Sequence, residues 1–348
     1  MRTLLKRAGG TAAILSSRAN VAWATAGGQH HVVTSAETGV GALLIAESGA
    51  WFVAPNIERA RLAAEEFDGL GIDVIDYDWW EDDGLQRCVH RVLGTRAGVT
   101  APLDDTALEQ ELSAHRSRLE SLDQERLARL GGVATAAVED ALATIEVGAT
   151  ENELAAALIG RLVGVRAPVV LVAADERIPR YRHPLPSSLR IEQRVMLVLV
   201  AEAWGLHVAV TRFRHWDQEP PELTERWDAV RAVQQAMTDA SVPGATLGGV
   251  FEAAQRAYAA HGHPNAWREH HQGGTIAYHG RERVAVPGDA TVIEAGMALA
   301  WNPSIAGVKV EDTLIVQADG THRVVTTLEP PDGPAAGWAS LQRPSERS

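Results

Sequence analysis

Short apolar runs alternate with helical patterns over the first hundred residues of the chain. The runs at 12–15, 42–44, 51–54 and 72–77 have the length and flanking residues of strands. Between the last two runs, the apolar positions of 57–67 recur at the spacing of a helix. Strands and helices in alternation predict an α/β domain at the amino-terminal end.

The pattern changes after a Pro- and Asp-rich segment at 101–110. Long amphipathic helices are predicted over 107–145, with a break near Ser121, so a domain boundary is expected in this region. A turn follows, where the Thr150 hydroxyl and the Glu153 carboxylate are spaced to form a capping box. A further helix is therefore predicted to begin there and to end near Val163.

The rest of the chain combines β-branched runs with two more helices. The runs at 168–173, 195–203 and 207–213 predict strands, and Trp204-Gly205-Leu206 between the last two predicts a hairpin. Further elements are expected as helices at 221–241 and 246–262 and as strands at 274–277, 298–303 and 312–317. From position 330 the sequence lacks periodicity and is predicted to be a disordered tail.

Composition excludes several classes of function. The 348 residues carry 32 basic and 45 acidic side chains, a net charge of −13 that opposes sequence-independent nucleic-acid binding. No apolar run approaches the roughly 20 residues of a membrane span. The single cysteine, Cys88, offers neither an intramolecular disulfide nor a paired metal motif, which fits a reducing, cytoplasmic compartment. The first residues predict a short helix, a turn and a strand rather than a secretory signal.

Four clusters carry candidate chemistry, and the first two contain histidines. His183 precedes Pro184, which disfavours helix and fixes the local chain, so His183 is a candidate general base; a surface-loop histidine is the alternative. His270-His271 precede two glycines that would let the backbone approach a ligand closely. Exposed loop histidines are equally compatible with that pattern.

The remaining candidates follow the histidine pair. Tyr278, Arg281 and Glu282 come next, and Arg281 is suited to hold a carboxylate in a bidentate fork. Asn302, in Trp301-Asn302-Pro303, offers a neutral donor and acceptor, and Glu311 offers an acid or base. Exposed positions at a strand edge are the alternative for these last two.

In this order, the clusters resemble the creatinase and aminopeptidase P family, the M24 group. The segments 150–154 and 307–313 resemble the helix-start motif and the closing strand of that family. The resemblance covers most of the chain and implies an α+β protein. It implies a creatinase-like α/β domain over 1–122 and a pita-bread domain over 123–329, a curved antiparallel sheet backed by helices, followed by the tail at 330–348. It also implies a homodimer.

The same resemblance implies a metal site that this sequence has lost. Metallopeptidases of the family bind two divalent ions through two Asp, one His and two Glu. Val198, Ala209 and Asn302 stand at three of these positions, and only His271 and Glu311 match. Two ligands satisfy neither the charge nor the coordination number of a hard divalent cation, so we expect no metal and no other cofactor.

Creatinase, which resembles this chain in working without a metal, suggests the chemistry. His271, Gly274 and residues 280–282 resemble the motif of creatinase, and His183 matches the catalytic histidine of creatinase. The implied activity is hydrolysis of a C–N bond in an amide, amidine or short peptide. His183 would be the general base and Glu311 its partner.

The resemblance also distributes the substrate contacts. Arg281 would bind a substrate carboxylate, His271 and Tyr278 would donate hydrogen bonds, and Glu282 and Asn302 would complete the pocket. The loss of a Glu at position 302 argues against creatine itself. We expect a small molecule or short peptide as partner, and neither nucleic acid nor membrane.

Three alternatives stay open at this point. The fold could serve as a non-catalytic binding protein, because three of the family's ligands are replaced. A metal-dependent Xaa-Pro peptidase and a small-metabolite lyase are the other two, since a histidine base can also abstract a proton from carbon.

Overall fold

The computed structural model describes residues 2–94, 101–216 and 218–328, which form two compact units, 2–116 and 117–328. The division follows Arg116, whereas the boundary expected at 122/123 falls in the first turn of helix α6 (Ser121–Thr144). The tail predicted at 330–348 lies outside the described residues.

Unit 2–116 is built on a five-stranded sheet with the order β4-β3-β2-β1-β5. Strands β1 and β2 pair antiparallel, as do β2 and β3, while β4 and β5 join the two edges in parallel. The strands are β1 (Ala12–Ser17), β2 (Thr38–Ala46), β3 (Gly49–Pro55), β4 (Asp73–Tyr77) and β5 (Leu103–Asp104). The helices are α1 (Arg2–Arg7), α2 (Arg18–Ala24), α3 (Asn56–Arg61), α4 (Gly84–Leu93) and α5 (Asp105–Arg116). The single helix expected over 57–67 is divided, because its second half, η1 (Leu62–Glu66), is a π-helix.

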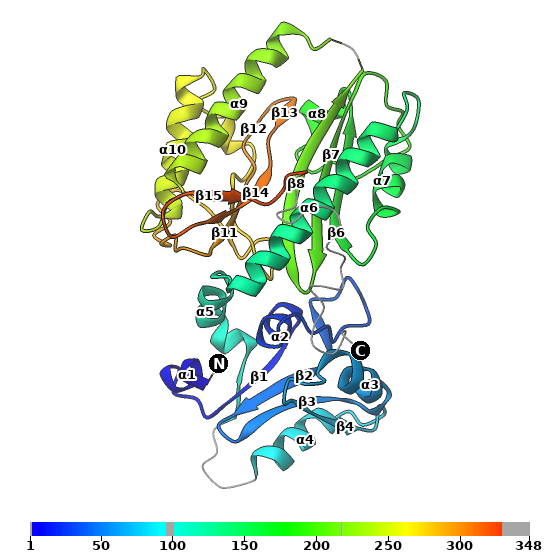
Figure 1. The fold of residues 1–348 in the computed structure, drawn as a ribbon, viewed down its shortest axis with the longest axis vertical. Helices are drawn as coiled ribbons and strands as arrows, with labels where there is room; N and C mark the ends of the chain where they lie inside the picture. Colours follow the sequence, from blue (N-terminus) through cyan, green and yellow to red (C-terminus); the bar gives the residue numbers. More distant parts are fainter. Residues whose placement is uncertain (1, 95–100, 217, 329–348) are drawn as a thin grey trace. The chain divides into compact units, whose positions relative to one another are not determined.

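Unit 117–328 contains two larger antiparallel sheets, a two-stranded sheet and their covering helices (Figure 1). The first sheet consists of β6 (Arg166–Ala174), β7 (Arg194–Ala203) and β8 (Leu206–His215), and α6 packs against β7 and β8. The second has the order β10-β9-β11-β14-β15. Its strands are β9 (Gly273–Thr275), β10 (Arg283–Val284), β11 (Ala298–Trp301), β14 (Asp312–Val316) and β15 (His322–Val324). The other elements are α7 (Glu151–Ile159), α8 (Arg177–Arg180), α9 (Pro221–Ala240), α10 (Leu247–Ala260), η2 (Ala266–Arg268), β12 (Ser304–Ile305) and β13 (Val308–Lys309).

Two local predictions hold in detail. Thr150 and Glu153 form the capping box at the start of α7, although the helix ends at Ile159 rather than near Val163. Trp204 and Gly205 form the two-residue turn of the β7–β8 hairpin, both with positive φ, which is the conformation that matches the twist of paired strands.

In the core of unit 117–328, the second sheet packs against α9 and α10. The large buried side chains of this core include Trp301, Phe251 and Tyr258. Strand β8 meets the second sheet where Thr211 pairs with Glu311, and the His207 amide of β8 also donates to the Ala277 carbonyl just after β9. This junction is where the sequence predicts its site.

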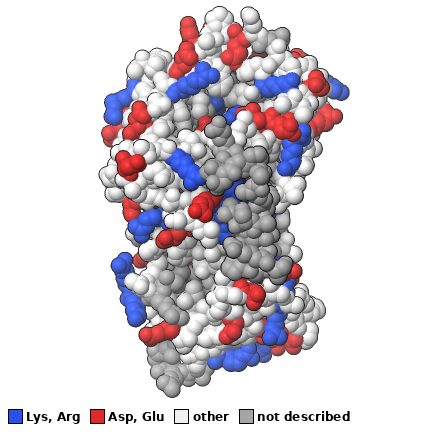
Figure 2. Space-filling model, in the orientation of Figure 1, with Lys and Arg blue, Asp and Glu red and all other residues white. Residues whose placement is uncertain are grey.

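Charged side chains are mixed on the surface. Figure 2 shows acidic and basic side chains interspersed among the described residues of one face rather than a continuous basic surface, as the net charge predicts. None of the described helices combines the length and apolar character needed to cross a membrane.

One buried histidine makes the stability of the amino-terminal unit depend on pH. The Nε2 atom of His30 lies 3.1 Å from the carbonyl oxygen of Ser16, and its ring packs edge-on against Phe52. Gly39 must lack a side chain here, because a Cβ atom would lie 2.2 Å from the His30 ring. Burial lowers the pKa of His30 to about 4, and the charge of Arg18 adds to the effect.

We predict that acid destabilises this unit through His30. Between pH 6.5 and 4 the unfolded chain protonates His30 and the folded chain does not, so stability falls as pH falls. The contribution lost between pH 7 and 5 is about 2 kcal/mol. Urea unfolding of wild type and His30→Gln at both pH values should show the smaller pH dependence in the variant. Equal dependence in the two proteins would contradict the prediction.

Candidate functional site

The loop that carries His183 is anchored on both sides. The carbonyl of Pro184 accepts a hydrogen bond from the Val172 amide of β6. Further along, the buried Glu151 carboxylate accepts from the amide and hydroxyl of Ser187 and forms an ion pair with Arg177. These bonds fix the loop and leave His183 itself exposed, in a bend directly before Pro184.

The histidine pair is positioned by the residue that follows it. Tyr258 of α10 donates a hydrogen bond to the Gln272 side chain, which in turn donates to the carbonyl of His270. The chain then enters β9 at Gly273, whose φ is +99° and where a Cβ atom would lie 2.1 Å from the Ala300 carbonyl oxygen. The glycine therefore permits close packing of β9 on β11, rather than the close approach to a ligand that the sequence suggests.

Three histidines come together at this point. The Nε2 atoms of His183 and His270 lie 3.1 Å apart, which is a hydrogen bond with one ring donating and the other accepting. The rings of His270 and His271 stack at 4.3 Å between centroids, and those of His183 and His271 lie 5.7 Å apart. The sequence predicts His183 and His271 at the site, and the structure adds His270.

The histidines are neutral at pH 7. Burial lowers the pKa of His270 to about 3 and that of His271 to about 4, with the charges of Lys309 and Arg281 as the next largest causes. Burial also lowers the pKa of His183, and Lys309 again contributes. Each neutral ring has one nitrogen that accepts a proton or a hydrogen bond.

Glu311 is the buried anion of the site. Its Oε1 accepts from Arg281 at 2.8 Å, and its Oε2 accepts from Lys309 at 2.7 Å and from the Thr211 hydroxyl at 2.7 Å. Burial alone raises the pKa of Glu311, but Lys309 and Arg281 outweigh it and hold the pKa at about 2. Glu311 is thus a permanent carboxylate with both oxygens engaged, unlike the free acid or base that the sequence suggests.

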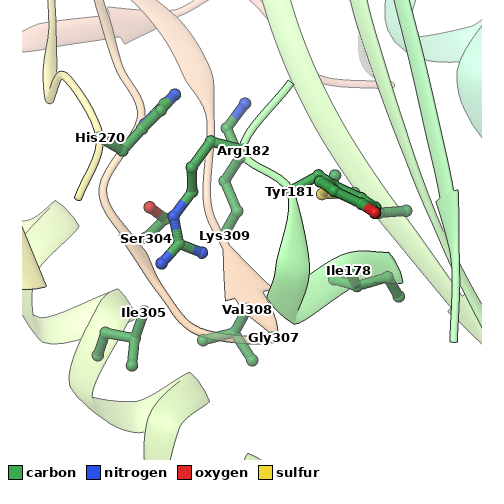
Figure 3. A pocket seen from close by; sticks show the side chains of 10 residues that line it. Ile178, Tyr181, Arg182, His270, Ser304, Ile305, Gly307, Val308 and Lys309 are labelled. Atoms are coloured by element: carbon green, nitrogen blue, oxygen red, sulfur yellow. The ribbon is translucent and has the colours of Figure 1, made fainter. Parts of the chain in front are cut away.

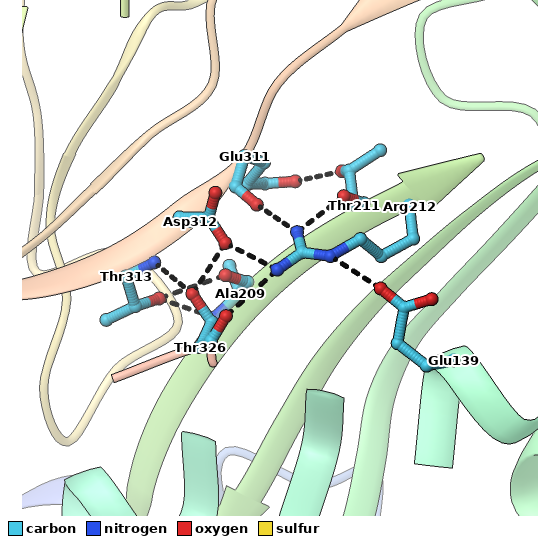
Figure 4. A network of polar contacts seen from close by, with 8 residues as sticks. All are labelled: Glu139, Ala209, Thr211, Arg212, Glu311, Asp312, Thr313 and Thr326. Atoms are coloured by element: carbon cyan, nitrogen blue, oxygen red, sulfur yellow. Dashed lines mark hydrogen bonds and ion pairs between the residues drawn. The ribbon is translucent and has the colours of Figure 1, made fainter. Parts of the chain in front are cut away.

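A polar network fixes Glu311 to both sheets (Figure 4). Arg212 of β8 bonds Asp312 and the carbonyl of Thr326 and pairs with Glu139 of α6. Alongside it, the Thr313 hydroxyl donates to the Ala209 carbonyl and accepts from the Ala209 amide. Glu311 and the two residues that follow it are therefore held against β8.

Arg281, Tyr278 and Glu282, which the sequence predicts as substrate contacts, instead bond groups of the protein. Arg281 bonds Glu311 and the Gly280 carbonyl, so its guanidinium faces a protein carboxylate rather than standing open for a substrate carboxylate. Tyr278 donates to Asp123 of α6 at 2.9 Å, and Glu282 accepts from the amides of Tyr278 and His279. These bonds give Tyr278 and Glu282 roles in holding their loop, and no described hydrogen bond joins them to the histidines.

Asn302 lies beside the histidine loop. Its amide donates to the Gln272 carbonyl at 3.1 Å, which continues the pairing of β11 with β9. The side chain is buried and its Oδ1 lacks a hydrogen-bond partner. A buried unpaired acceptor is costly, so a bound group that donates to Asn302 would gain affinity.

A small cleft opens next to the cluster (Figure 3). The space that a water-sized molecule can enter is about 20 Å³, and the cleft opens to solvent beyond it. Polar lining comes from Arg182, His270, Ser304 and Lys309, and apolar lining from Ile178, Met196, Ile305 and Val308. Arg182 pairs with Glu269. The cleft thus combines cationic groups with short apolar walls.

Lys309 is the residue of the candidate site to which sequence reasoning gives no role. The chain has only two lysines, Lys6 and Lys309, against thirty arginines, since Lys and Arg together number 32. Lys309 is buried, with 7% of its surface exposed, and it donates a hydrogen bond to the Glu311 carboxylate. Lysine is rare in this chain, and Lys309 lies two positions before the predicted acidic residue Glu311. These two facts together are the signal that could have identified Lys309.

Comparison with known proteins identifies the family. A family model described as metallopeptidase family M24 matches residues 125–318, more than half of the chain. The chain belongs to the M24 family. A search of curated proteins finds no match.

Solved M24-type structures share the fold over nearly the whole chain. A dipeptidase PepE from Mycobacterium ulcerans is 20% identical, with a TM-score of 0.72 and 94% of each chain covered. The prolidase from Pyrococcus furiosus is 17% identical, with a TM-score of 0.74, and the match covers 94% of this chain and all of that one. The N-terminal domain of the FACT complex subunit SPT16 from chickpea is 11% identical, with a TM-score of 0.67, covering 94% and 93%. These likenesses confirm the α+β pita-bread architecture.

The residues present do not fit the metal centre that the M24 name implies. Val198 packs in an apolar cluster with Leu171, Ile178 and Met196, and Ala209 offers only a methyl group. Two cations already occupy the Glu311 carboxylate. Among the described residues, the grouping of three metal-ligating side chains is His183, His270 and His271, a set without carboxylates. Hard divalent ions need oxygen ligands that these positions lack.

We predict that Lys309 stabilises this M24 protein strongly. Lys309→Met should lower the free energy of unfolding by about 3–5 kcal/mol, because it leaves a buried carboxylate with less compensation. The matched control is Lys6→Met, since Lys6 and Glu47 form an exposed pair at 4.0 Å, and its effect should be about 0.5 kcal/mol or less. Urea unfolding measures both.

The double variant Lys309→Met/Glu311→Gln should recover part of the loss, because it buries no charge. The prediction is wrong if Lys309→Met costs no more than Lys6→Met.

Proposed function

We propose that this M24 protein hydrolyses a C–N bond in a small amide-, amidine- or dipeptide-like molecule without the family's carboxylate metal centre, with His183 as the general base. The observation that carries the proposal is the Nε2–Nε2 hydrogen bond of 3.1 Å between the exposed His183 and the buried His270. It joins an accessible imidazole to a fixed one beside a small cleft.

The hydrogen bond defines how His183 would act. When His183 donates its Nε2 proton to His270, the Nδ1 lone pair of His183 is left to accept a proton from water. The imidazolium formed then keeps its bond to His270 and delivers the proton to the departing nitrogen. His270 is a positioning residue in this scheme, and Gln272 holds it through the His270 carbonyl.

Positive charge near the cluster supports the attack of water on a carbonyl or amidine carbon. Lys309 lines the cleft and contributes to the electrostatics of all three histidines. An ammonium group has three N–H donors, and Glu311 accepts one of them. Lys309 would stabilise the negative charge that develops on the attacked group. Glu311 would hold Lys309 and Arg281 in place rather than transfer a proton.

The lining of the cleft suggests the substrate. The N–H groups of Arg182 and Lys309 that do not pair with Glu269 and Glu311 would donate to an anionic group. Ile178, Met196 and Val308 would contact a short apolar group. A dipeptide or an N-acyl amino acid has both features. Dipeptidases and prolidases are among the solved proteins with this fold, which favours substrates of that size.

A non-catalytic binding role is the second candidate. The solved SPT16 domain of a FACT complex shares the fold, and the engaged oxygens of Glu311 resemble a structural ion pair more than an acid or base. We also propose that the protein is a cytoplasmic homodimer. Its domains would be a creatinase-like domain over 1–122 and a pita-bread domain over 123–329.

We predict turnover that survives chelation and depends on His183. Purified wild type, His183→Ala and the exposed control His261→Ala would be incubated, with and without EDTA, with Xaa-Pro dipeptides, N-acyl amino acids and guanidino acids. Mass spectrometry should detect products from wild type and His261→Ala in both conditions, and at least about a hundredfold less from His183→Ala.

The contradicting outcomes point in different directions. Turnover that EDTA abolishes would show that hydrolysis depends on a metal ion, as in metal-dependent M24 peptidases. An absence of product from wild type would favour the binding role.

A further inference from the structure

We propose that His183, His270 and His271 bind one borderline transition-metal ion, with Zn²⁺ as the probe, through a set of ligands that shares only His271 with the M24 metal centre. One nitrogen of each ring lies within 4.8 Å of the others. All three belong to unit 117–328, on two anchored loops. The ion would replace the proton that His183 and His270 now share.

The spacing suits a tetrahedral ion. Two nitrogens bound to one Zn²⁺ at about 2.0–2.1 Å lie about 3.3 Å apart in tetrahedral geometry. The Nε2 atoms of His183 and His270 are 3.1 Å apart, so their separation already suits the ion, and the two rings need only turn until both lone pairs point to it. His271 would move closer, and the exposed position of His183 leaves the fourth coordination position accessible to water.

A second observation concerns the burial of His270. The residue is 8% exposed, yet the partner recorded for its ring nitrogens is another imidazole, and its Nδ1 has no hydrogen-bond partner. Burying an imidazole with so little polar compensation is unfavourable. A bound ion would take the Nε2 lone pair and offset that cost, whereas an apolar residue would serve a purely structural position better.

The ligand set decides which ions are preferred. Three neutral imidazoles suit Zn²⁺, Ni²⁺ and Cu²⁺, while Mg²⁺ and Mn²⁺ prefer carboxylate oxygens. The nearby charges of Lys309, Arg281 and Glu311 sum to +1, which opposes a cation. The His270 Nδ1 also lacks an acceptor to orient the ring. We therefore expect a dissociation constant in the micromolar range rather than the tight binding of a structural zinc site.

Occupancy would inhibit the hydrolase, and this consequence rests on the proposed function. The ion takes the lone pairs of His183 and His270, so the hydrogen bond that prepares His183 as a base no longer exists. Membership of the M24 family implies that metal ions activate the enzyme. Zn²⁺ bound by the three histidines would instead inhibit hydrolysis, and only His271 of these ligands belongs to the family's set.

The test is a calorimetric titration of untagged, EDTA-treated and desalted protein with ZnCl₂. Wild type and the surface control His261→Ala should each bind one Zn²⁺ with similar affinity, and excess Mn²⁺ should not compete. His183→Ala and His270→Ala should each weaken binding at least about tenfold. His183 is exposed on its loop, so His183→Ala remains informative even if His270→Ala fails to fold.

Co²⁺ provides a second readout, because its visible spectrum distinguishes tetrahedral from octahedral coordination. Tetrahedral bands in wild type that disappear in His183→Ala would support the site. Equal Zn²⁺ affinity in wild type and His183→Ala, or no binding by wild type, would overturn it.

Activity separates this inference from the proposed function. Inhibition of turnover by stoichiometric Zn²⁺ supports both. Activation by Zn²⁺ bound at the three histidines would retain the site and overturn metal-independent hydrolysis. Metal-free turnover in a protein that does not bind Zn²⁺ would overturn the site and retain the hydrolase.

Discussion

The charge of Glu311 must be balanced inside the protein, and much of the surrounding structure serves that balance. A carboxylate removed from water is tolerated only when cations and hydrogen-bond donors surround it. Lys309, Arg281 and Thr211 supply them from three different segments. Because Thr211 lies on β8 and Glu311 directly precedes β14, the ion cluster also joins the two sheets. The same two cations then set the electrostatic environment of the histidines.

The substitutions at the family's ligand positions form a consistent set. An aspartate at 198 would enter the apolar cluster that now holds Val198, and one at 209 would lie beside Thr313, which bonds the backbone of Ala209. In the metal-free site that we propose, several carboxylates and two divalent ions are replaced by one carboxylate and two organic cations. Both arrangements balance charge, but only the second leaves neutral imidazoles as the chemically adaptable groups.

The sequence predicted the architecture well and the site incompletely. Helix and strand positions followed from periodicity, and the capping box at Thr150 and the turn at Trp204 followed from local chemistry. His183 and His271 were predicted to share a site, and their rings lie 5.7 Å apart. Lys309 was missed because nothing in a linear pattern shows that a lysine two residues from a glutamate in an extended segment will be buried with it. Tyr278 and Arg281 were given substrate contacts from a motif, but their partners, Asp123 and Glu311, are distant in sequence and become neighbours only through packing.

The scarcity of lysine gives this protein an unusual chemical property. Amine-directed reagents meet only Lys6, Lys309 and the terminal amino group of this chain, and Lys6 is exposed whereas Lys309 is buried in an ion pair. Reductive methylation with ¹³C-formaldehyde would therefore place very few spectroscopic labels on the molecule. The label on Lys309, introduced where the ion pair opens, would report directly on the charge state and occupancy of the centre. The cation that compensates Glu311 is thus also a nearly unique observation point within the site.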